Sequence, residues 1–271
     1  MQSIQLGPFT FATSLFAFMA AAIAALLLAA WLDRRSRTRA ESALWRGMLL
    51  GVVAGRLGFL IQQWDFYRHA PLSWLDLRDG GLMLPAAVAA ALAYWLWRGL
   101  RDKAMLPALS GGLAVGLAAF ALIMSWAGTM QTQKPRILPA VALQPVQAQT
   151  DSPAGLQGYQ GKLTVVNLWA TWCPPCRREM PAFKQVQSSR DDVHIVFANQ
   201  GEEADVIQQY LDKEKLELAN MWRDPQMQLG QAVRSRGLPT TLFLDAQGRL
   251  LDVRAGELSA ATLNDRIDRL M

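Results

Sequence analysis

The sequence predicts a two-domain fold: an α-helical membrane domain over 1–127 and an α/β domain, a mixed sheet flanked by helices, over 151–271. Long apolar runs fill the first part, whereas the remainder has the composition of a soluble domain. The net charge of +5 also lies in 1–127, which holds 11 Lys and Arg against 6 Asp and Glu. The only two cysteines stand three residues apart, between an apolar run and a helical stretch. A length of 271 residues fits about two domains.

Hydrophobic segments in the first part predict about four transmembrane helices, at roughly 8–32, 44–63, 82–98 and 105–127. A helix needs about 20 apolar residues to cross a bilayer core of about 30 Å, and the third segment is the shortest. The first is too long, and too poor in N-terminal positive charge, for a cleaved signal peptide.

The charges of the loops predict the orientation of these helices. Four arginines lie in 33–39 and three positive residues in 98–103, whereas 64–81 holds two arginines against three aspartates. The positive-inside rule places the loops at 33–39 and 98–103 in the cytoplasm. Both termini and the α/β domain then face the periplasm of a bacterial inner membrane, an oxidising compartment. Residues 128–271 contain no Lys/Arg cluster of the kind that would indicate nucleic-acid binding.

Small residues and one arginine mark the second segment. Gly47, Gly51 and Gly55 recur every four residues, which predicts a close helix contact. Arg56 falls near mid-membrane, where it either has a function or snorkels or pairs with a carboxylate of the bundle.

Three stretches of this half carry a family resemblance: Leu6-Gly-Pro-Phe-Thr10, Gly55-Arg-Leu-Gly58 and Asp79-Gly-Gly81. Over roughly 1–100 they resemble the N-terminal part of prolipoprotein diacylglyceryl transferases. The family's His-Gly-Gly is missing, with Pro85 about where the histidine would stand, and its later Gly-Arg-x-Gly-Asn signature is absent. The resemblance therefore implies a truncated, non-catalytic relative of that membrane domain.

Residues 128–150 are predicted to be a linker, because they are rich in proline and glutamine and lack helical periodicity. Beyond them, apolar patterning predicts alternating strands and helices. A strand is expected at 163–169, a helix at 174–188, a buried parallel strand at 193–198 and a helix around 206–211. A short helix after Pro225, a hairpin of 240–245 with 250–254 and a final helix around 263–270 complete a mixed sheet covered on both faces.

The cysteines occupy the motif Trp172-Cys-Pro-Pro-Cys176 at the predicted start of a helix. Free N–H groups and the helix dipole favour a thiolate there, and residues three apart share a helix face on which two sulfurs can bond. We expect Cys173 to be the exposed nucleophile and Cys176 the more buried resolving thiol.

Two other interpretations of the cysteines are open. A structural disulfide closing so short a loop would constrain the unfolded chain little. A zinc site needs about four ligands, and the chain offers two cysteines with His69 and His194, so no metal is expected.

Two matching stretches, Val166-Asn-Leu-Trp-Ala-Thr-Trp-Cys-Pro-Pro-Cys-Arg-Arg-Glu-Met-Pro181 and Gly237-Leu-Pro-Thr-Thr241, resemble the thioredoxin superfamily. The resemblance covers 151–271 and is specific to the membrane-tethered TlpA/ResA/DsbE-like thiol–disulfide oxidoreductases. It implies a thioredoxin-like fold, a cis peptide before Pro239 against the disulfide, and substrate binding by Trp172, Leu238 and Pro239. Glu179 matches a glutamate near the family's active site, although an exposed first-turn acid is the alternative. Asn167 stands where thioredoxin has a buried aspartate.

The sequence as a whole predicts a membrane-anchored, periplasm-facing reductase of protein disulfides, with no cofactor beyond the redox-active Cys173–Cys176 pair. An oxidant role stays open, because sequence does not fix the redox potential. Residues 1–127 contain no cysteine, so electrons are expected from a separate membrane thiol reductant. The rivals are a lipid-modifying transferase-like protein and a non-catalytic membrane scaffold carrying a thioredoxin module. A peroxidase is a weaker alternative, because the sequence contains no recognisable peroxidatic motif.

Overall fold

The computed structural model describes residues 3–6, 9–36, 40–68, 74, 81–130, 136–139, 141–147, 155–235 and 237–271. Contacts divide the chain into two compact units, Gln2–Thr132 and Gln133–Met271. Several expectations concern residues outside the described ranges. They involve 37–39 of the first arginine-rich loop, His69, most of the loop at 64–81, including Asp79, and parts of the expected linker.

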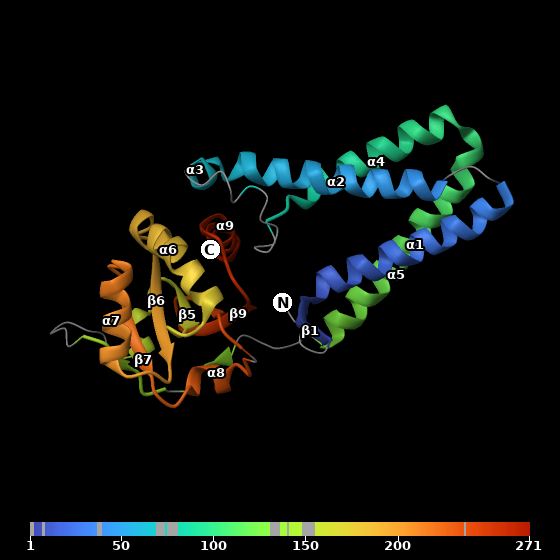
Figure 1. Cartoon of the computed structure of the whole chain (residues 1–271). Coiled ribbons are helices and arrows are strands. Elements are labelled where there is room, and N and C mark those ends of the chain that lie inside the picture. Colours follow the sequence, from blue (N-terminus) through green and yellow to red (C-terminus); the bar gives the residue numbers. More distant parts are fainter. Residues whose placement is uncertain are drawn as a thin grey trace. The chain divides into compact units, whose positions relative to one another are not determined.

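The described residues of the first unit form four long helices: α1 (Thr13–Ser36), α2 (Ala40–Gln62), α4 (Leu84–Arg101) and α5 (Leu106–Met130). Short helical turns, α3 (Trp64–Tyr67) and η2 (Lys103–Met105), lie between them. Figure 1 shows that α1 packs along α5 and that α2 packs along α4.

The chain enters this unit through a hairpin rather than through helix. Strand β1 (Ser3–Leu6) pairs antiparallel with β2 (Phe9–Ala12), and α1 begins at Thr13 instead of near residue 8. Aromatic and β-branched residues in Phe-Thr-Phe favour a strand over helix, which explains the difference.

Within the described part of this unit, two helical segments are long and apolar enough to cross a membrane. Ala40–Gln62 has a mean hydropathy of 1.5 and Lys103–Trp126 one of 2.0. Among the described residues, α1 contributes a shorter apolar stretch, Met19–Leu32. The structure therefore supports two candidate spans, and four spans stay a prediction.

Glycines of α2 allow the close approach of α4, as their spacing predicts. A Cβ on Gly51 would lie 2.7 Å from the carbonyl oxygen of Ala87, and one on Gly55 would lie 2.9 Å from the Ala87 Cβ. At Gly47 the space is filled by the ring of Trp95, whose Nε1 donates to the carbonyl of Ala43 at 3.1 Å. The two backbones thus approach more closely than any larger side chain would permit.

Arg56 is buried and binds two backbone carbonyls beyond α3. Its guanidinium donates to the carbonyls of Trp74 and Gly81, at 2.9 Å each, and lies 5.2 Å from the centre of the Tyr67 ring. The side chain therefore holds Trp74 and Gly81 near α2, a structural role that accounts for its burial.

The second unit is built on a seven-stranded mixed sheet of order β3-β9-β8-β5-β6-β7-β4. Its centre is parallel, formed by β5 (Leu163–Trp169), β6 (Val193–Gln200) and β7 (Met221–Asp224). On one side follow the antiparallel strands β8 (Thr240–Leu244) and β9 (Arg249–Ala255). The two-residue strands β3 (Arg136–Ile137) and β4 (Gln144–Pro145) form the edges. The predicted mixed sheet is confirmed.

Helices cover both faces of this sheet (Figure 1). On one face lie α6 (Pro174–Ser189), α7 (Ala204–Glu214) and α9 (Ala260–Leu270). Ring contacts fix α6 and α7 there: Phe183 packs on Phe197, and Trp169 packs on Tyr210. The opposite face holds η3 (Gly155–Tyr159) and α8 (Gln228–Ala232), which pack on a cluster that includes Val166 and Leu168.

Part of the expected linker belongs to this sheet, which differs from the prediction for 128–150. Strands β3 and β4 pair with β9 and β7, and Leu138 is buried in the core. Two-residue strands are too short to show an alternating pattern, and an edge strand accommodates the proline at 145. The α/β unit therefore begins before residue 151.

Candidate active site

The two cysteines form a disulfide at the N-terminus of α6. Cys173 caps the helix, and its Sγ accepts a hydrogen bond from the N–H of Cys176 at 3.2 Å. Pro174 and Pro175 occupy the first helical positions, whose N–H groups would have no helical partner. The same N–H and the positive end of the helix dipole would stabilise a thiolate on Cys173 after reduction.

Both cysteines are buried, which corrects the expectation of an exposed Cys173. Cys173 has 3% of its surface exposed and Cys176 has 0%. The capping geometry explains the difference, because the Cys173 sulfur turns back over the first turn of α6. Cys173 is nevertheless the more accessible of the two, and Trp172 beside it is 68% exposed.

The loop before β8 reaches the same edge of the sheet as the disulfide. The peptide bond between Leu238 and Pro239 is cis, as the family resemblance implies. Strand β8 then pairs antiparallel with β5, with Thr240 opposite Leu168. Pro239 therefore precedes β8 where β5 ends and the cysteine loop begins. Pro239 is buried and Leu238 is partly exposed.

Glu179 lies under the helix rather than on its surface, with 1% of its area exposed. Its Oε1 accepts a hydrogen bond from Asn167 Nδ2 at 2.7 Å, and its Oε2 accepts one from the N–H of Leu258 at 3.0 Å. Burial raises the pKa of the Glu179 carboxyl to about 8, because desolvation outweighs the two hydrogen bonds. The nearby charge of Glu257 raises this pKa further. The alternative of an exposed first-turn acid is therefore wrong.

Asn167 is suited to a partner that changes its charge. An amide offers both a donor and an acceptor, and its Oδ1 is buried with no hydrogen-bond partner among the described residues. In the observed orientation Nδ2 donates to the carboxylate. A rotation of the amide would let Oδ1 accept from a protonated Glu179.

Glu202 binds the loop that leads into the cysteines, a contact that was not predicted from the sequence. Its carboxylate accepts hydrogen bonds from the backbone N–H and the hydroxyl of Thr171, at 2.7 and 2.5 Å. Asn199 Nδ2 donates to the same carboxylate at 2.6 Å. The signal was available, because polar residues that follow neighbouring parallel strands meet at one edge of the sheet.

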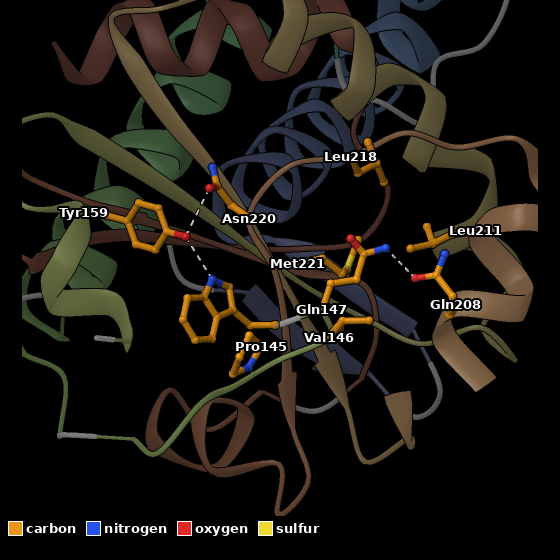
Figure 2. Close-up of a pocket in the computed structure, with 10 residues that line it drawn as sticks. Pro145, Val146, Gln147, Tyr159, Gln208, Leu211, Leu218, Asn220 and Met221 are labelled. Carbon is orange, nitrogen blue, oxygen red and sulfur yellow. Dashed lines mark hydrogen bonds between the residues drawn. The ribbon is translucent and has the colours of Figure 1, made fainter. Parts of the chain in front are cut away.

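A small cavity lies elsewhere in this unit, between β4, β7 and α7 (Figure 2). Its volume is about 40 Å³, room for a water molecule or two and far below the roughly 300 Å³ at which small-molecule pockets begin. At one end the hydroxyl of Tyr159 accepts a hydrogen bond from Trp222 Nε1 and lies 3.2 Å from Asn220 Oδ1. No residue of the cysteine loop lines this cavity.

No group of three or more His, Cys, Asp or Glu side chains able to hold a metal occurs among the described residues. His194 packs edge-on against the ring of Tyr159, with 5.4 Å between the ring centres. His69 lies outside the described ranges.

A cysteine pair that starts a helix after the central strand of a mixed sheet, beside a cis-proline loop, defines a thioredoxin-type thiol–disulfide oxidoreductase. Comparison with known proteins agrees. The AhpC/TSA family matches residues 137–253. The thiol:disulfide interchange protein HelX of Rhodobacter capsulatus is 31% identical over 168 residues, which cover 61% of this chain and 93% of HelX.

Further relatives match shorter lengths of the chain. The thioredoxin-like protein YneN of Bacillus subtilis is 29% identical over 42% of this chain and 69% of YneN. The thiol-disulfide oxidoreductase ResA of Bacillus subtilis is 27% identical over 41% of this chain and 62% of ResA. A solved thiol:disulfide interchange protein of Chlorobium tepidum overlaps 51% of this chain and 96% of its own, with 28% identity and a TM-score of 0.40. The chain belongs to the thioredoxin-superfamily thiol:disulfide oxidoreductases, and its activity is thiol–disulfide exchange.

Proposed function

We propose that the protein is a membrane-anchored reductase of protein disulfides whose α/β unit faces the periplasm. The observation that carries the proposal is the cysteine pair at the N-terminus of α6, where the Cys173 sulfur accepts an amide N–H. Cys173 has 3% of its residue surface exposed and Cys176 has 0%. Such a position favours a thiolate nucleophile.

The proposed reaction moves two electrons from the chain to its substrate. The Cys173 thiolate attacks one sulfur of the partner disulfide, so that a mixed disulfide forms and one partner thiolate leaves. The thiolate of Cys176 then attacks Cys173 Sγ, which restores the Cys173–Cys176 bond and releases the second partner thiolate. The partner gains two electrons and two protons, and the chain loses them.

Glu179 is proposed to manage the proton of Cys176 during the second step. It lies one turn further along α6 and is buried, and its pKa of about 8 is close to that of an ordinary thiol. A base and an acid of matched pKa exchange protons readily near neutral pH. Trp172, Leu238 and Pro239 are proposed to bind the substrate segment that carries the disulfide, with the backbone of Leu238 pairing to it as an added strand would.

The membrane half is proposed to span the bilayer four times, with both termini in the periplasm. Support comes from the two candidate spans and from the arginine-rich loops of the sequence. Residues 1–127 contain no cysteine, so they cannot relay electrons between thiols. Re-reduction of the α/β unit is therefore assigned to a separate membrane thiol reductant.

The full-length chain in detergent is expected to accelerate the reduction of insulin by dithiothreitol, because each cycle passes two electrons through the cysteine pair. Insulin turbidity measures the rate. A double variant, Cys173→Ser with Cys176→Ser, is the control and should leave only the uncatalysed rate. Equal rates for the wild type and the double variant would reject the reductase proposal in favour of a scaffold or a lipid-modifying role.

Alkaline phosphatase fused after Met271 is expected to be active in a bacterial host, because the loops at 33–39 and 98–103 carry the positive charge. A fusion within 98–103 serves as the matched control and should be inactive. If a fusion after Met271 is active only when the reporter is a cytoplasmic one, both the orientation and the periplasmic site of the chemistry are wrong.

A further inference from the structure

Three loops meet at the edge of the sheet where the cysteine loop begins. Strands β5, β6 and β7 are parallel, and Trp169, Asn199 and Arg223 stand in one row across them. The segments that follow these residues, 170–173, 200–203 and 224–227, therefore leave the same edge. Adjacent strands lie about 4.8 Å apart, so the first and third loops start about 10 Å apart.

Direct contacts link these loops in series. The N–H of Thr171 donates to the carboxylate of Glu202 at 2.7 Å. The N–H of neighbouring Gly201 donates to the carbonyl of Asp224 at 3.1 Å. A Cβ on Gly201 would lie 3.8 Å from both Cγ and Sδ of Met227. A series of contacts therefore runs from the cysteine loop to Met227, and an interface patch of about 800 Å² centred on that loop has a radius of roughly 16 Å, wide enough to include neighbouring loops.

The backbone at Met227 has a conformation that the fold alone would not assign to methionine. Its φ of 52° lies in the left-handed region, which costs about 1 kcal/mol for a residue with a Cβ. Glycine or asparagine would suit the position better. The side chain is 50% exposed, so burial offsets only part of that cost.

A buried carboxylate fixes this conformation. The side chain of Asp224 accepts the N–H groups of Gln228 and Leu229, at 2.9 and 2.8 Å, and binds Gln200 Nε2 at 3.2 Å. The carbonyl of Asp224 accepts the N–H of Met227 at 3.0 Å. The loop therefore holds Met227 in one place, partly exposed, at the edge of the sheet that carries the disulfide.

We propose that Met227 is a specificity-determining residue for protein substrates, acting with Trp172 as an apolar rim around the cysteine pair. The occupant is an apolar side chain close to the disulfide of the substrate protein. A methionine side chain is unbranched and polarizable, so it can adapt to several such side chains. This inference rests on the proposed function, because it assumes that protein disulfides dock at Trp172 and Cys173.

The test compares a protein disulfide with a small one, using the full-length chain in detergent. Met227→Gln keeps the size of the side chain and makes its end polar. The variant is expected to lower, about tenfold, the ratio of kcat/KM for insulin to kcat/KM for glutathione disulfide. The change should come mainly from KM, and its size corresponds to losing the burial of about half a side chain. Met227→Leu should restore the ratio.

Leu251→Gln is the matched control. Leu251 is also partly exposed, but it lies at the opposite end of the sheet, next to Leu250, which pairs with Leu244. The ratio should be unchanged in this variant. If the wild-type chain reduces insulin but the ratio is unchanged in Met227→Gln, the proposed role of Met227 is wrong and the proposed function is not affected. A wild-type chain that reduces neither disulfide would overturn the proposed function as well.

Discussion

Glu179→Gln is expected to remove most of the dependence of the protein's stability on pH between about 4.5 and 8. In the folded chain burial raises the pKa of Glu179 from 4.5 to about 8. A group whose pKa is higher in the folded than in the unfolded state stabilises the fold. This stabilisation is complete at a pH below the unfolded-state pKa and is lost as the pH rises through the folded-state pKa. The loss amounts to at most about 5 kcal/mol, at 1.36 kcal/mol for each pKa unit.

Glutamine at 179 keeps a carbonyl oxygen for the N–H of Leu258 or for Asn167 and cannot ionise. The variant should therefore resemble the wild type at pH 5 and be more stable by several kcal/mol at pH 9. Urea unfolding of the full-length chain, followed by tryptophan fluorescence across this range, measures the effect. Glu217→Gln is the control, because Glu217 is exposed and its replacement should leave the profile of the wild type.

The same substitution is expected to change the kinetics of the second chemical step. If Glu179 takes the proton of Cys176, the wild-type rate of the second step, plotted against pH, should inflect near pH 8. The Glu179→Gln variant should lack this inflection and carry out the step about 100-fold more slowly. Stopped-flow reaction of the reduced chain with a model disulfide between about pH 5 and 9 gives both profiles. Superimposable profiles would reduce Glu179 to a structural residue.

Several parts of this picture were accessible from the sequence because their signals are local. The apolar run at 163–169 and the cysteines next to it predict a strand that ends at a helix N-terminus, and the structure places β5 and α6 there. The hairpin of β8 and β9 follows from Ala-Gln-Gly between two apolar runs. Local patterns of this kind need no knowledge of the tertiary fold.

Other parts depend on segments that are distant in sequence. The burial of Glu179 requires Leu258, 79 residues further on, and the Asn167 amide from the neighbouring strand. Strand β7 has four residues and β3 and β4 have two each, too few for a periodic signal. The accessibility of Cys173 depends on how its sulfur caps α6, which no composition or spacing reveals.

The second large effect concerns the division of labour between the two cysteines. Cys173→Ala is expected to reduce disulfide exchange to the uncatalysed rate, a loss of several orders of magnitude, because the nucleophile is gone. Cys176 cannot replace it, since its side chain is fully buried. Cys176→Ala should instead complete the first step and stop, because nothing remains to displace the partner from Cys173.

Trapping the mixed disulfide tests the central claim most directly. The chain has only two cysteines, so each variant carries a single thiol and any adduct has one possible site. The full-length Cys176→Ala and Cys173→Ala variants, reduced and freed of reductant, are each mixed with insulin, quenched in acid and examined by mass spectrometry. A redox centre with Cys173 as nucleophile predicts an insulin adduct in Cys176→Ala that dithiothreitol releases, and none in Cys173→Ala. An adduct in Cys173→Ala alone, or in neither variant, would contradict it.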